Sequence, residues 1–144
     1  MKKNLDKSRL SPNDITLGII GGGQLGKMMG LEARRMSLNL AYLDPEINCP
    51  ASTISDQMIV SDFKDEKAII ELAKKSDVLT YEIELANSSV LKGLESRGYV
   101  VHPASQVLYT IQNKIRQKKF LRDNRIPVPD FEEVISIEQA KKIC

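Results

Sequence analysis

Short apolar runs alternate with amphipathic segments along most of this chain, and that alternation restricts the fold more than any other feature. The apolar runs have the length and composition of strands, at residues 15–20, 38–43, 57–60, 78–83 and 99–102. Segments with helical spacing lie at residues 24–36, 65–75, 88–97 and 105–124. Because parallel neighbours need crossover connections, this order predicts an α/β fold, a Rossmann-like open parallel sheet with helices on both faces.

The first predicted helix, at residues 24–36, is amphipathic. Its spacing predicts that Lys27, Arg34 and Arg35 face water. The apolar positions that define the opposite face are Leu25, Met28, Met29, Leu31 and Met36.

A glycine turn, residues 21–26 (GGGQLG), joins the first predicted strand to this helix. Glycines permit positive φ and close approach of a ligand to the backbone, and a helix N-terminus favours an anion such as phosphate. The turn also satisfies the G-x-G-x-x-G dinucleotide fingerprint, with Asp44 at the end of the second strand where a ribose-binding acid would stand. The turn alone is compatible with three roles: phosphate binding, dinucleotide binding, or only the packing of the helix on the sheet.

Two acids, Glu82 and Glu84, follow a strand that should be central in the sheet. Open α/β sheets bind ligands at the carboxyl ends of such strands, although acids there also cap helices or face solvent. The single histidine, His102, precedes a proline, and we expect it to be structural. Neither Cys49 nor Cys144 belongs to a C-x-x-C pair, so no metal site and no catalytic triad is expected.

The formal net charge is +2, but residues 111–125 carry six basic side chains and one acidic one, a local net charge of +5. This cluster is either a solvated helix face or a site for an anion or nucleotide. Phe120 is the only aromatic residue within it, so a nucleic-acid partner is not expected.

The sequence predicts three segments. Residues 1–14 form a flexible extension, residues 15–125 a Rossmann-like domain, and residues 126–144 a proline-rich linker with the start of a truncated second domain, including a strand at 131–135 and a helix from 136. No apolar run approaches the roughly 20 residues that cross a bilayer, and no signal peptide is evident. We therefore expect a cytoplasmic protein with no membrane partner.

Several motifs occur in an order and spacing that resemble one family. They are GGGQLGKMM at 21–29, YLDPEINCPAS at 42–52, Asp56, VLTYEIE at 78–84 and QNKIRQKKFLRDNRIPVP at 112–129. Together they resemble the amino-terminal part of the 5-(carboxyamino)imidazole ribonucleotide synthases, the ATPase subunits of phosphoribosylaminoimidazole carboxylase in the ATP-grasp superfamily. The resemblance covers residues 15–144. Related formate-dependent transformylases usually have Glu-Leu in the turn, so Gln24-Leu25 favours the carboxylating family.

The resemblance implies a ligase, also classed with a lyase, of purine biosynthesis that converts aminoimidazole ribonucleotide, bicarbonate and ATP to the carboxyamino product, ADP and phosphate. It implies that the ribonucleotide is bound in a pre-ATP-grasp domain, and ATP at the basic helix. The implied ribonucleotide contacts are Gly23, Gln24, Leu25 and Glu82, and the implied ATP contacts are Lys114 and Lys118.

The resemblance also implies that Mg²⁺ and the catalytic groups depend on residues downstream of this segment, and that the full-length enzyme forms a homodimer. We therefore expect the 144-residue chain alone to be inactive. The alternative is an NAD-sensing Rossmann regulatory module. That reading explains the glycine turn and Asp44 but not Gln24, the YEIE strand end or the basic helix.

Overall fold

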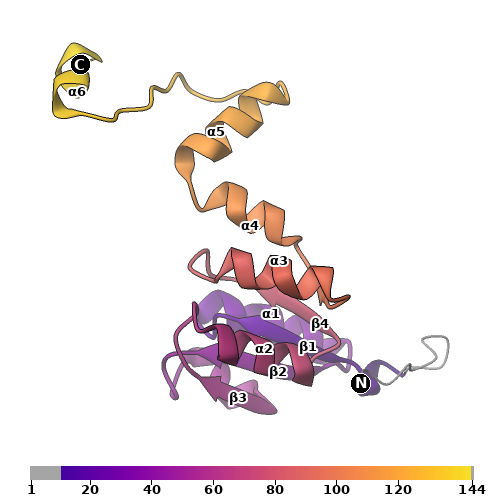
Figure 1. Ribbon diagram of the computed structural model, residues 1–144. Coiled ribbons are helices and arrows are strands. Elements are labelled where there is room, and N and C mark those ends of the chain that lie inside the picture. Colours follow the sequence, from indigo (N-terminus) through magenta and orange to yellow (C-terminus); the bar gives the residue numbers. More distant parts are fainter. Residues whose placement is uncertain (1–10, 144) are drawn as a thin grey trace. The chain divides into compact units, whose positions relative to one another are not determined.

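Five parallel strands form one sheet in the order β3-β2-β1-β4-β5, in a computed structural model that describes residues 11–143 (Figure 1). The strands are β1 (Thr16–Ile20), β2 (Asn39–Asp44), β3 (Gln57–Val60), β4 (Val78–Tyr81) and β5 (Val100–Val101). The predicted parallel sheet is confirmed. The strand β4 ends two residues earlier than its apolar run, which leaves Glu82 in the following loop.

The centre of the sheet is fully buried. Ile19 and Ile20 of β1 are inaccessible to solvent, as are residues 40–43 of β2. In register, Gly18 lies between Ala41 of β2 and Leu79 of β4. A strand that is covered on both faces consists of a continuous run of apolar residues. These strands could therefore be predicted from the sequence.

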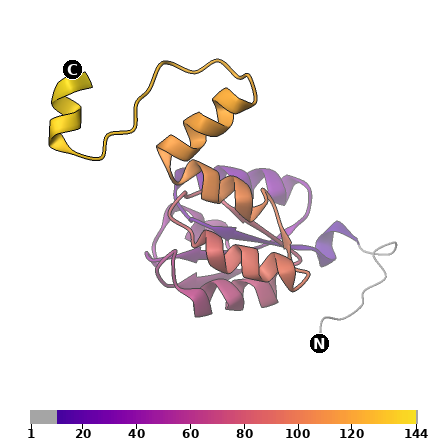
Figure 2. The same cartoon turned by 45° about the horizontal axis from the view of Figure 1, so that its top comes forward.

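Helices cover both faces of the sheet, as predicted. The helix α1 (Gln24–Arg35) and the 3₁₀ helix η3 (Pro50–Ile54) contact each other and pack on β1 and β2. The helices α2 (Glu66–Lys75) and α3 (Ser88–Ser96) lie on the opposite face, α2 against β1, β2 and β4, and α3 against β5 (Figure 2). The start of α2 is capped by Asp65, whose carboxylate accepts two backbone N–H groups.

The buried face of α1 differs from the apolar face that the sequence suggested. The helix buries Gly26, Gly30 and Ala33, because added side-chain atoms at either glycine would overlap Gly21 or Tyr42. The five larger apolar residues are exposed by 37–61% (Leu25, Met28, Met29, Leu31 and Met36). The close packing of backbone on sheet thus selects small residues for the contact.

The 3₁₀ turn η2 (Pro12–Asp14) precedes β1, and the predicted extension at residues 1–14 otherwise lies outside the described residues. The chain divides into two compact units, Met1–Tyr109 and Thr110–Cys144. The boundary predicted near residue 125, between a Rossmann-like and a truncated domain, stays a prediction.

The basic segment forms two helices instead of the single predicted one, α4 (Ser105–Ile111) and α5 (Lys114–Asp123). The break occurs at Asn113, whose side chain accepts the Arg116 N–H at 2.9 Å and so caps a new helix.

The predicted strand at 131–135 is wrong, since these residues have no regular structure before α6 (Ile137–Ile143). Ile135 instead donates its N–H to the Gln139 side chain at 3.0 Å. In the described part of the chain, no helix is long and apolar enough to cross a membrane.

Candidate functional site

The candidate site lies where the strand order reverses, at the carboxyl ends of the neighbouring strands β1 and β4. The chain proceeds from β1 outward through β2 and β3, then returns to β4 on the other side of β1. Open α/β sheets bind ligands in the crevice at this point, because the loops of the two strands diverge there. The glycine turn follows β1, and Glu82 follows β4.

Glu82 lies directly beside the glycine turn. Gly21 has a φ of +105°, and a Cβ added there would lie 2.9 Å from Glu82 Oε2. A Cβ added at Gly23 would lie 3.9 Å from the same oxygen. The backbone conformation at position 21 favours glycine, and a side chain there would also displace the Glu82 carboxylate.

The start of α1 is open to a ligand. Gly23 is its N-cap residue, so no side chain caps the first turn. Gln24 and Leu25 open the helix, and both side chains are exposed. Uncapped N–H groups and the helix dipole favour a negatively charged group at this end.

The environment of Glu82 makes its carboxylate a hydrogen-bond acceptor in need of donors. Burial raises the pKa of Glu82, and the nearby charges of Glu84 and Asp44 raise it further. Among the described residues, none donates a hydrogen bond to this carboxylate. A ligand hydroxyl or amine placed here would supply the missing donor and stabilise the charge.

Asp44, the residue that the dinucleotide fingerprint places on a ribose, is buried and already bonded. Its Oδ2 accepts the Gly22 N–H at 2.7 Å, and its Oδ1 accepts the Glu46 N–H at 2.9 Å. Both carboxylate oxygens therefore serve the protein backbone.

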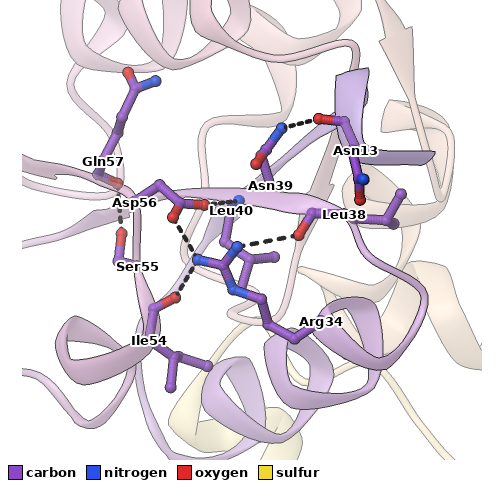
Figure 3. Close-up of polar contacts among 9 residues, drawn as sticks. All are labelled: Asn13, Arg34, Leu38, Asn39, Leu40, Ile54, Ser55, Asp56 and Gln57. Atoms are coloured by element: carbon purple, nitrogen blue, oxygen red, sulfur yellow. Dashed lines mark hydrogen bonds and ion pairs between the residues drawn. The ribbon is translucent and has the colours of Figure 1, made fainter. Parts of the chain in front are cut away.

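Arg34, predicted to face water, instead joins α1 to the segment between η3 and β3 (Figure 3). Its guanidinium lies 2.6 Å from Asp56 and donates to the Ile54 carbonyl at 2.9 Å. Asp56 also accepts the Leu40 N–H at 2.8 Å. The hydrogen bond from Arg34 holds the pKa of the Asp56 carboxyl below its ordinary value. Among the motifs that resemble the family, Asp56 therefore has a structural role.

The two lysines predicted to contact ATP lie on α5, in the second compact unit. Lys114 is exposed, and its ammonium lies 3.3 Å from the Gln117 side chain. Lys118 is half-buried and lies over the Phe131 ring, 5.4 Å from its centre, where Arg122 approaches at the same distance. The first unit, by contrast, brings together all four residues predicted to bind the ribonucleotide.

Residues 15–112 match the family model of the ribonucleotide synthetase preATP-grasp domain. The chain belongs to this family. The resemblance drawn from the motifs is therefore confirmed, and the glycine turn and Glu82 both lie within the matched preATP-grasp region.

Curated relatives of this preATP-grasp chain include a phosphoribosylaminoimidazole carboxylase and an N5-carboxyaminoimidazole ribonucleotide synthase. A chloroplastic phosphoribosylaminoimidazole carboxylase from Vigna aconitifolia is 37% identical over 128 residues, which are 89% of this chain and 23% of the relative. An N5-carboxyaminoimidazole ribonucleotide synthase from Brucella melitensis is 38% identical over 85% of this chain and 33% of its own length. The chain thus spans a third or less of these curated relatives.

Solved structures agree with this assignment. The N5-carboxyaminoimidazole ribonucleotide synthetase from Thermotoga maritima is 44% identical, with a TM-score of 0.81 over 90% of this chain and 36% of that one. The synthase from Aspergillus clavatus, solved with ADP and 5-aminoimidazole ribonucleotide, is 39% identical, with a TM-score of 0.74 over 82% of this chain and 31% of that one.

The sequence alone does not decide whether Asp44 contacts a ligand or begins a turn. The spacing of Asp44 from the glycines was visible, but the loop that brings its carboxylate onto Gly22 was not. The one available signal was Pro45, since Asp-Pro commonly begins a turn.

Proposed function

We propose that this chain is the amino-terminal, ribonucleotide-binding domain of an ATP-dependent ligase of purine biosynthesis. The full-length enzyme converts 5-aminoimidazole ribonucleotide, bicarbonate and ATP to 5-(carboxyamino)imidazole ribonucleotide, ADP and phosphate. One observation carries the proposal. At the point where the strand order reverses, the uncapped N-terminus of α1 lies beside the carboxylate of Glu82, which accepts no hydrogen bond from the described residues. A relative of the same family has been solved with this ribonucleotide and ADP.

The four site residues bind different parts of the ribonucleotide in this proposal. The N–H groups at Gly23, Gln24 and Leu25 bind its anionic end, because an uncapped helix start favours phosphate. Glu82 accepts a hydrogen bond from a ribose hydroxyl or the exocyclic amine, which relieves the desolvation of its carboxylate.

Lys114 and Lys118 bind the phosphates of ATP in this proposal. Lys114 is exposed at the start of α5, and the segment around it is strongly basic. Lysine supplies positive charge there without the bidentate geometry of arginine.

The proposed full-length enzyme also uses bicarbonate and Mg²⁺ and forms a homodimer. No group of three or more acidic, histidine or cysteine side chains in residues 11–143 is arranged to hold a metal ion. The proposed location is the cytoplasm. The lyase classification applies to the phosphoribosylaminoimidazole carboxylase, of which this ligase is the proposed ATPase subunit.

The alternative, an NAD-sensing module, is not favoured. Dinucleotide-binding folds use an acid at the end of the second strand to bind the ribose hydroxyls. Here that acid is Asp44, which is only 6% exposed and accepts the backbone N–H groups of Gly22 and Glu46, so little of its carboxylate is accessible to a ribose.

Calorimetric titration of the 144-residue chain with 5-aminoimidazole ribonucleotide and, separately, with NADH tests the proposal. We expect the ribonucleotide to bind and NADH not to bind. Glu82→Gln should weaken ribonucleotide binding by about tenfold or more, because a hydrogen bond to a charged acceptor contributes roughly 1.5–3 kcal/mol.

The matched control is Glu71→Gln on α2, where the native carboxylate pairs with Lys75 at 2.9 Å away from the turn. This variant should bind the ribonucleotide like the native chain. Tight NADH binding without ribonucleotide binding would contradict the proposed function.

A further inference from the structure

We infer that Asp44 is a positioning residue, which holds the glycine turn in the shape that opens the start of α1 to the ribonucleotide. The inference rests on the proposed function, because it concerns the affinity of the same site. It differs from the ligand contacts assigned above, since Asp44 acts through the backbone of Gly22.

The segment after β2 holds Gly22 by both of its backbone polar groups. The Gly22 N–H donates to Asp44 Oδ2 at 2.7 Å, and the Gly22 carbonyl accepts the Ala51 N–H at 2.9 Å. The preceding Gly21 N–H donates to the Leu43 carbonyl at 2.9 Å. The first half of the turn is therefore fastened to β2 and η3, and the second half, from Gly23, forms the open helix start.

The Asp44 carboxylate is itself held in one orientation. Its other oxygen accepts the Glu46 N–H at 2.9 Å, and the residue is only 6% exposed. Hydrogen bonds to a charged acceptor are roughly twice as strong as neutral ones, and the partial exclusion of water strengthens them further. Asparagine has one acceptor oxygen, so it would turn an amine toward one of the two N–H groups.

The space beside Gly22 is filled by neighbouring side chains. A Cβ added at Gly22 would lie 2.5 Å from Cys49 Sγ and 3.3 Å from Asp44 Oδ2. Cys49 is buried, so its sulfur fills the space on that side. Loss of the carboxylate would leave a donor unpaired in a buried place, and the turn would have to shift to reach water.

The test compares Asp44→Asn with Asp77→Asn. Asp77 is a matched control because it accepts the Thr16 N–H at 2.9 Å, at the opposite end of the same strand β1. For Asp44→Asn we expect ribonucleotide affinity to fall by about tenfold, with shifted amide NMR signals at Gly22, Gly23 and Gln24. Asp77→Asn should keep native affinity and native turn signals, although it also loses a carboxylate bonded to backbone.

A second readout is the titration of Glu82 followed by NMR. Asp44 lies close enough to raise the pKa of Glu82, so Asp44→Asn should lower that pKa and Asp77→Asn should leave it unchanged. Hydrogen exchange in the native chain adds a measurement without any variant, and the Gly22 amide should be protected.

Native affinity and native turn signals in Asp44→Asn, or an unprotected Gly22 amide in the native chain, would overturn the inference. Failure of the proposed function looks different. The native chain would then bind no ribonucleotide, while the exchange and turn signals would still report whether Asp44 holds Gly22.

Discussion

At the scale of single residues, Gly26 and Gly30 determine how closely α1 approaches the sheet. The Tyr42 hydroxyl donates to the Gly26 carbonyl at 2.9 Å, directly under the helix. Burial is the main cause that raises the pKa of Tyr42 to about 12, so this hydroxyl stays protonated and remains a donor. The Tyr42 hydroxyl is thus buried without losing its hydrogen bond, because the helix backbone supplies the acceptor.

Gly30→Ala should lower the free energy of unfolding by about 1–3 kcal/mol, because overpacking displaces neighbours. The added methyl group would overlap the Tyr42 hydroxyl and lie 2.9 Å from Ile54 Cδ1. Gly93→Ala in α3 is the control, since its new Cβ would meet nothing nearer than 4.0 Å. That variant should be more stable by roughly 0.5–1 kcal/mol from helix propensity alone. Equal stabilisation of both variants in urea denaturation would refute the overlap.

Side-chain spacing failed to predict the face that α1 buries, for the same reason. A periodicity argument weighs large apolar residues such as Met28 and Met36, which are about 60% exposed. The actual contact uses Gly26, Gly30 and Ala33, whose value lies in the absence of atoms. The glycine turn was recognisable because its chemistry is local, whereas this contact depends on what the sheet presents across the gap.

At the scale of elements, most of the sheet could be predicted from sequence. The strand β3 has the predicted bounds, and the others differ by one or two residues, because buried parallel strands give continuous apolar runs. The basic segment was harder. The predicted helix at 105–124 gave no sign of the break at Asn113, where a single side-chain cap divides the segment into α4 and α5.

The link between α1 and the η3–β3 segment depends on Arg34 and Asp56. Arg34→Ala should lower the free energy of unfolding by about 1 kcal/mol, since both side chains are partly exposed and solvent screens the pair. Arg35→Ala is the control, because Arg35 pairs with Glu32 at the exposed surface, where an ion pair contributes little.

The pH dependence separates the charge of this pair from packing. The folded state lowers the pKa of Asp56 from its ordinary value of 3.8, chiefly through the Arg34 hydrogen bond. The stabilisation is therefore present above that value and is lost as the pH falls below it. The difference between native chain and Arg34→Ala should shrink on acidification below about pH 4. A difference that grew in acid would contradict this account.

At the scale of the whole molecule, the chain carries a five-stranded parallel sheet but spans a third or less of the length of its curated relatives. Its first unit holds the proposed ribonucleotide site, and its second holds the basic helix α5. Binding and turnover should therefore separate. A preformed turn can select the ribonucleotide, whereas phosphoryl transfer requires metal ions and charged groups arranged around the reacting phosphate.

We expect the purified 144-residue chain, given 5-aminoimidazole ribonucleotide, bicarbonate, ATP and Mg²⁺, to release no phosphate above background while it still binds the ribonucleotide. The physical reason is that phosphoryl transfer needs metal ions and charged groups placed around the reacting phosphate, and this chain corresponds to a third or less of the length of its curated relatives. A coupled phosphate assay and calorimetry on the same sample measure both properties. The Glu82→Gln variant controls for binding at the proposed site. Phosphate release near the roughly 1 s⁻¹ or faster turnover of ordinary enzymes would show that this segment contains the catalytic groups we place elsewhere.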